Sequence, residues 1–116
     1  MAVSHTCTTP TGALRVRIAN SFLTRALGLL IGRPLEPEEG LLISPCGSIH
    51  TFGMRYAIDV IFLDRAGCVL RVCPDVRASR MRWARGARAV LELRSGAAAR
   101  HGLVPGLRLA ELVPGL

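Results

Sequence analysis

Lysine is missing from this chain of 116 residues: all fifteen basic residues are arginine, against eight acidic residues and a formal net charge of +7. A complete absence of lysine indicates a coding bias toward GC-rich arginine codons rather than selection for one basic site. An excess of arginine still attracts phosphates and acidic surfaces. The total charge therefore identifies no partner, and each local arginine cluster has to be judged separately.

Aromatic residues are also scarce, at 4% of a chain that is 50% hydrophobic. The core must then consist of leucine, valine, isoleucine and alanine, and such a composition argues against disorder. The chain has no apolar run of the roughly 18 residues that cross a bilayer, and no export signal at its start. We expect a single cytoplasmic domain over residues 1–116 with no transmembrane segment.

No two cysteines have the CxxC spacing of many metal and redox sites. The four cysteines occupy positions 7, 46, 68 and 73, and in a reducing compartment they are expected to be free thiols. Cys68 and Cys73 would point to opposite faces of one strand, so they are poor ligands for one ion. The sequence predicts no metal site and no cofactor.

Most of the patterns present are those of β-strands. Leu14, Val16 and Ile18 alternate with arginines after a turn at residues 9–12, which indicates a hairpin with residues 3–8. Residues 20–34 instead show the leucine spacing of a helix, which glycine and proline then end.

Further short strands are indicated at residues 41–44, 68–73 and 87–94. A short helix beginning at Ser95 and a final strand within residues 105–112 complete the pattern. With about seven or eight short strands and two short helices, the fold class is mainly β. We predict a compact sandwich or a partly closed barrel, with helices covering its edges.

Five blocks of sequence carry a family resemblance. They are "TRALGLLIGRP", "GLLI", "HTFGMRYAIDVIFLDRAG", "ARAVLELRSG" and "GLVPGLRL", in that order. Over about residues 12–112 the chain resembles the bacterial and archaeal family of domain of unknown function 192. The resemblance implies a compact, β-rich, sandwich-like domain and no established reaction.

The resemblance also marks single positions. Those that match the family pattern are Arg25, Gly28, Leu29, Met54, Arg55, Asp59, Phe62 and Gly96. This chain has Gly53 where the family often has tryptophan, and Tyr56 and Ala57 where it has asparagine and proline. Many relatives carry an export signal that this chain lacks.

Residues 46–64 combine reactive side chains with an apolar run. Imidazole can take the proton of a thiol, so Cys46 and His50 are candidates for a thiol-dependent enzyme. A regular strand would hold them about 13 Å apart, so this reading requires a bend, which Pro45 and Gly47 permit. Cys46, His50 and Met54 are also conceivable ligands for Cu(I). A buried structural thiol and a core methionine are the alternatives.

Asp59 is surrounded by apolar residues and needs a charged partner or backbone donors. Arg55 and Arg25 are candidate partners. Asp59 then either fixes the strand register or positions Arg55 in a pocket for an anionic group.

The segment 77–88 is rich in arginine around the single tryptophan. Arginines bind phosphates and indole stacks on bases, so Arg80, Arg82, Trp83 and Arg85 are candidate anion-binding residues. The alternative is a solvated loop with Trp83 anchored against the sheet.

The leading hypothesis is a small, non-enzymatic binding or accessory domain. Its polar pocket would contain His50, Met54, Arg55 and Asp59 and recognise an anionic small molecule or a segment of a partner protein. The rivals are the thiol enzyme using Cys46 and His50, and nucleic-acid or acidic-partner binding through residues 77–88.

Overall fold

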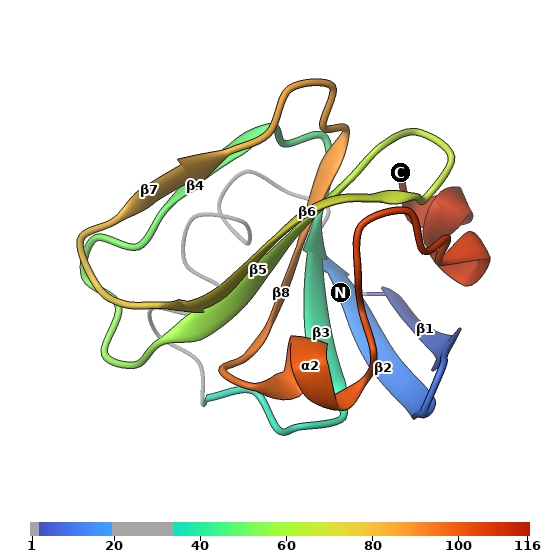
Figure 1. The fold of residues 1–116 in the computed structure, drawn as a ribbon, viewed down its shortest axis with the longest axis horizontal. Helices are drawn as coiled ribbons and strands as arrows, with labels where there is room; N and C mark the ends of the chain where they lie inside the picture. The colour runs from blue at the N-terminus through green and yellow to red at the C-terminus, as the bar shows by residue number, and fades with distance from the viewer. Residues whose placement is uncertain (1–2, 20–33) are drawn as a thin grey trace.

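The fold is that of a computed structural model, which describes residues 3–19 and 34–116 (Figure 1). The helix predicted at residues 20–34, with Arg25, Gly28 and Leu29, therefore lies outside the described residues except for its last position.

The predicted N-terminal hairpin is present. β1 (Val3–Thr9) pairs antiparallel with β2 (Gly12–Ala19), and Thr9 lies opposite Gly12 at the turn. Leu14, Val16 and Ile18 are buried, as their alternation with exposed arginines predicted.

A six-stranded sheet forms the centre of the described structure. Its order is β1-β2-β3-β8-β5-β6, and it contains β3 (Glu39–Ile43), β5 (Ile58–Leu63), β6 (Val69–Val76) and β8 (Ala89–Arg94). Only β2 and β3 are parallel among these neighbouring pairs. All six residues of β5 are buried, because both faces of the sheet are covered at this strand.

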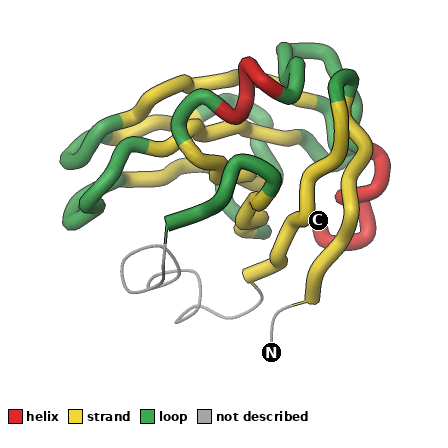
Figure 2. Tube along the Cα trace, turned by 90° about the horizontal axis from the view of Figure 1, so that it is seen from below, coloured by secondary structure: helices red, strands yellow, loops and turns green. Residues whose placement is uncertain are grey.

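Each face of the sheet has its own hydrophobic core. On one face, buried residues from β2, β3, β5 and β8 pack with α2 (Ala97–Arg100) and the 3-10 helix η1 (Ala110–Gly115). The position of α2 on that face is visible in Figure 2. On the other face, Phe62, Val60 and Leu41 belong to a second core, against which Ile49 packs.

Ile49 belongs to a separate two-stranded sheet, which we call the ribbon. The ribbon consists of β4 (Ser48–His50) and β7 (Met81–Trp83), lying side by side in Figure 1. Among the described residues there are thus eight strands in two sheets. The large sheet does not close, because β1 and β6 are its two ends. The prediction of a mainly β, sandwich-like fold is confirmed.

One local prediction was wrong. The final strand expected within residues 105–112 is replaced by a single bridge between Cys68 and Arg108, followed by η1. The chain turns there because Leu109 and Leu112 both enter the core, which an extended strand with alternating faces would not allow. The short helix predicted to begin at Ser95 is present as α2, which begins after Gly96.

Candidate functional site

The strand register decides which side chains of the ribbon face outward. Ser48 lies opposite Trp83, and His50 lies opposite Met81. Direct cross-strand partners share a face, so these four side chains project from one side. The middle pair, Ile49 and Arg82, points to the other side, where Ile49 packs on the second core.

The outward side carries large apolar groups that solvent reaches. The exposed fractions are 52% for Phe52, 56% for Met81 and 63% for Trp83. The rings of His50 and Phe52 lie 5.1 Å apart between centroids and are tilted by 30°. We call the set Ser48, His50, Phe52, Met81 and Trp83 the ribbon face.

The alternative in which Trp83 anchors a solvated loop against the sheet was wrong. The residue lies on a strand, and its indole points away from the core because neighbouring Arg82 occupies the inward position. Its backbone is nevertheless held firmly: the Arg71 Nη1 of β6 donates a hydrogen bond to the Trp83 carbonyl at 2.7 Å.

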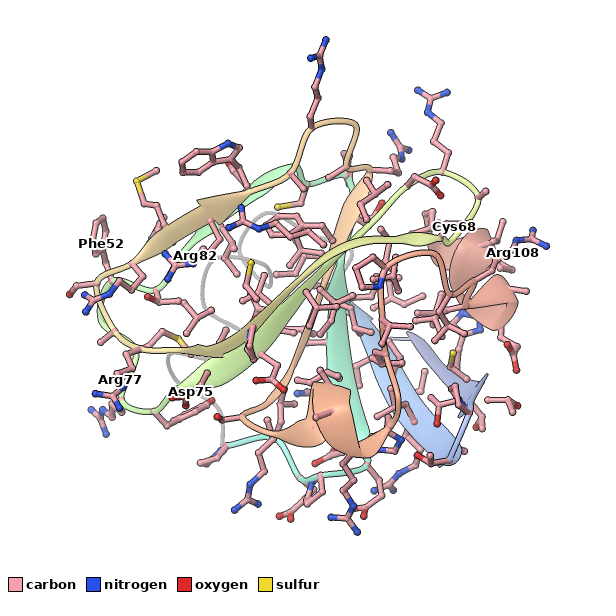
Figure 3. The ribbon with its side chains drawn as sticks, in the orientation of Figure 1. Phe52, Cys68, Asp75, Arg77, Arg82 and Arg108 are labelled. Atoms are coloured by element: carbon pink, nitrogen blue, oxygen red, sulfur yellow. The ribbon has the colours of Figure 1, made fainter. Side chains whose placement is uncertain are left out.

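The predicted anion-binding arginines do not all share one surface. Arg80 and Arg85 are exposed beside the ribbon face. Arg82 is half-buried on the inward side, where its Nη1 donates to the Met81 carbonyl at 2.7 Å. Figure 3 shows Arg82 inside the ribbon and Phe52 outside it. Arg77 lies farther along the loop, 3.9 Å from the Asp75 carboxylate.

A buried threonine, which the sequence analysis missed, holds the loop that carries these arginines. Thr51 is 1% exposed; its hydroxyl donates to the Arg77 carbonyl at 2.6 Å and accepts from the Arg80 amide at 2.9 Å. The Thr51 backbone amide also donates to the Arg80 carbonyl at 2.9 Å. The position of Arg80 beside the ribbon is therefore fixed by its backbone. A threonine between a strand and a loop gives no signal of this role in the sequence.

The Asp59 carboxylate is used by the backbone. It accepts hydrogen bonds from the amides of Asp75 at 2.8 Å, Gly96 at 3.1 Å and Ala98 at 2.9 Å. Gly96 and Ala98 are at the start of α2, so the Asp59 carboxylate caps the first amides of this helix from another strand. These bonds tie β5 to β6 and α2, and they favour the register-fixing interpretation.

The other pocket candidates lie apart from Asp59. Arg55 is exposed, Met54 packs beside the second core, and His50 is on the ribbon face. Asp59 points to the opposite side of the sheet, toward α2. The structure does not bring these four side chains together, and their role in ligand binding stays a prediction.

Cys46 and His50 also have separate contacts. The Cys46 thiol donates to the Ser48 carbonyl at 2.9 Å, whereas the His50 ring packs on Phe52. All four cysteines have free thiols. Among residues 3–19 and 34–116 there is no group of three or more His, Cys, Asp and Glu side chains that could hold a metal ion. No helix in this part of the chain is long and apolar enough to span a membrane.

A second buried acid was also missed. Glu92 of β8 is 4% exposed, and burial raises the pKa of its carboxyl to about 8. Burial and the nearby Glu92 charge raise the pKa of Tyr56 as well. Glu92 lies on the same face of β8 as Val90, which belongs to the second core, so this core covers the face that carries Glu92.

Comparison with known proteins places this architecture in a family. The model of domain of unknown function 192, described as "Uncharacterized ACR", matches residues 4–110. A protein of the UPF0127 family from Pyrococcus horikoshii is 47% identical over 55 residues, covering 42% of this chain. The match spans 45% of that relative's own length.

Two solved structures have a similar fold. A protein of unknown function from Novosphingobium aromaticivorans aligns with a TM-score of 0.76 and 26% identity, covering 90% of this chain and 81% of that one. A candidate transcription regulator from Sinorhizobium meliloti aligns with a TM-score of 0.79 and 24% identity, covering 96% and 92% respectively. The second likeness shows the fold alone. The family model matches residues 4–110, well over half of the chain, and the chain therefore belongs to the family of domain of unknown function 192.

Proposed function

We propose that this protein is a binding domain for single-stranded nucleic acid, and that the ribbon face is its binding surface. The observation that carries the proposal is the exposure of Met81 and Trp83 on one face of a two-stranded sheet and of Phe52 two residues beyond β4, beside the exposed Arg80 and Arg85. Soluble proteins seldom expose several large apolar groups together unless a partner covers them.

The local charge supports an anionic partner. Residues 44–57 and 77–88, which form the ribbon and its flanking loops, contain six arginines and no aspartate or glutamate. The remaining residues have nine arginines and eight acidic residues, so they are almost neutral. A coding bias explains why the basic residues are arginine, but it does not explain why the acids are absent here.

The rings favour nucleic acid over an acidic polypeptide. Bases stack on exposed aromatic rings whatever their sequence, and arginine guanidinium groups bind phosphates with paired donors. Trp83 and the His50–Phe52 pair provide two such ring surfaces. An acidic peptide would satisfy the arginines but would leave these rings without flat partners. A cytoplasmic location, which suits this partner, stays a prediction.

Fluorescence of the single tryptophan gives a direct test. Titration with an oligothymidylate should quench Trp83 emission, because the indole lies at the proposed contact. Phe52→Ala should weaken binding roughly 5- to 150-fold, the equivalent of about 1–3 kcal/mol for one stacked base. Trp83→Ala should do the same when binding is followed by anisotropy of a labelled oligonucleotide.

Val104→Ala is the matched control, since Val104 is 57% exposed but lies outside the ribbon face. It should bind like the unchanged chain. Binding of a polyglutamate peptide in preference to the oligonucleotide would reject nucleic acid as the partner, and equal losses in all three variants would reject the ribbon face.

A further inference from the structure

A hollow of about 700 Å³ opens at one end of the ribbon, and no residue of the ribbon face lines it. Its walls come from three loops: residues 45–47 before β4, residues 64–66 after β5, and residues 86–88 after β7. In Figure 1 the third of these loops lies at the top of the molecule and the second at its upper right. The volume is that of a typical small-molecule site.

Backbone hydrogen bonds hold the three loops in place. The Cys46 amide donates to the Arg88 carbonyl at 2.9 Å, and the Arg88 amide donates to the Leu63 carbonyl at 2.7 Å. The Gly47 carbonyl accepts from Ala84 at 3.4 Å. The three loops are therefore held in position before a ligand binds, which lowers the entropy cost of binding.

The lining combines two guanidinium groups with an apolar surface. Arg88 lines the hollow and is half-buried, and its Nη2 donates to a main-chain oxygen of Leu116 at 3.2 Å. Arg65 is exposed and has no partner among residues 3–19 and 34–116. Pro45, Ala66 and Ala87 supply apolar wall.

One carboxylate also borders the hollow, but its own loop uses it. Asp64 Oδ1 accepts from the amides of Ala66 and Cys68, both at 2.9 Å. These bonds offset part of its negative charge, so the two arginines dominate the site. An arginine pair beside an apolar wall suits a phosphate attached to a flat or apolar body.

We propose that this hollow binds a phosphate monoester, with Arg65 and Arg88 on the phosphate and the apolar wall against the attached group. The phosphate could belong to a free nucleotide or to the 5′ end of a nucleic-acid strand, since both offer the same dianionic group. The site does not depend on the ribbon face, because none of its lining residues belongs to that set.

Cys46 lines the hollow and serves as the reporter. The rate of iodoacetamide alkylation at Cys46 is followed by mass spectrometry in the unchanged chain, with half-buried Cys68 as the internal reference. Adenosine monophosphate at about ten times its Kd should slow alkylation of Cys46 roughly tenfold, because only the free fraction reacts. The rate at Cys68 should not change.

Arg65→Ala should abolish this protection, whereas Arg17→Ala, an exposed arginine on β2, should keep it. Trp83→Ala should also keep it, which separates this site from the ribbon face. Stronger protection by a 5′-phosphorylated oligonucleotide than by the unphosphorylated one would identify a strand end as the source, and protection by the mononucleotide alone would identify a free ligand. No protection by either phosphate, or equal protection by adenosine or by sulfate at matched ionic strength, would overturn the proposal.

Discussion

Asp59 and Glu92 are buried carboxyl groups on adjacent strands with opposite surroundings. Asp59 faces α2, and its carboxylate oxygens accept three backbone hydrogen bonds. Glu92 faces the second core, where burial disfavours its charge. The alternation of side chains along a strand separates them, since Val60 and not Asp59 lies opposite Glu92. Replacing each acid by its amide should therefore have opposite effects.

Glu92→Gln should remove a pH dependence of stability. The folded pKa is raised from 4.5 to about 8, so between these values the folded state keeps a proton that the unfolded state releases. The free energy of unfolding of the unchanged chain should then fall by up to about 1.4 kcal/mol per pH unit as the pH rises through this window. Below pH 4.5 the protonated Glu92 keeps its full contribution to the free energy of unfolding. Above about pH 8 the free energy of unfolding should no longer change through Glu92.

Urea unfolding at a series of pH values measures this effect. The variant should lack the decline and should be the more stable protein above pH 8. A parallel decline in both proteins would show that Glu92 is not its source.

Asp59→Asn should destabilise the fold although it preserves shape. An asparagine amide nitrogen cannot accept a hydrogen bond, so at least one of the amides of Asp75, Gly96 and Ala98 would lose its acceptor. The expected loss in the free energy of unfolding is about 1–3 kcal/mol for each unpaired donor. Urea unfolding at neutral pH checks it, and an unchanged midpoint would contradict the structural role assigned to Asp59.

At the scale of elements, the ribbon depends on contacts that lie far apart in the sequence. Its strands have three residues each, too few to be stable alone. Ile49 packs on the core, Arg71 holds the Trp83 carbonyl, and Thr51 holds the adjoining loop. The sequence predicted strands of five or more residues well, because β2 shows apolar alternation and β3 and β5 are short, nearly continuous apolar runs. It did not predict β7, whose arginine-rich context resembles a loop.

Thr51→Val should loosen the loop between β6 and β7. Valine has nearly the same shape but leaves the Arg80 amide and the Arg77 carbonyl without the Thr51 hydroxyl. We expect a loss of about 1–3 kcal/mol and faster tryptic cleavage after Arg77 and Arg80. Thr11→Val removes an exposed hydrogen bond to the Arg100 carbonyl and serves as the control. Similar cleavage rates in the two variants would show that Thr51 does not hold this loop.

At the scale of the whole molecule, charge is divided unevenly. The ribbon and its flanking loops carry six arginines without an acid, while the rest is nearly balanced. This division determines how nucleic-acid binding should respond to salt. Arginines contribute to that response only when they neutralise phosphates.

Arg80→Ala with Arg85→Ala should therefore reduce the salt dependence of oligothymidylate binding. Two lost phosphate contacts should lower the slope of log K against log salt by about 1.4. Arg15→Ala with Arg17→Ala makes the same charge change on β2 and should leave the slope unchanged. If both double variants lower the slope equally, binding depends only on the net charge of the protein, and the ribbon is not the phosphate-binding surface.

The sequence by itself determined the mainly β fold, the N-terminal hairpin, the apolar character of β5 and the family, because these depend on local alternation, on a continuous apolar run and on the order of motifs. It named Trp83 and Asp59 but could not choose between their alternative roles. Tertiary structure decided both. Trp83 faces solvent because pairing with β4 fixes the register of β7. The Asp59 carboxylate accepts hydrogen bonds from three backbone amides, each at least 16 residues away in the sequence. Such contacts leave no periodic signal along the chain, since they form only when distant segments pack together.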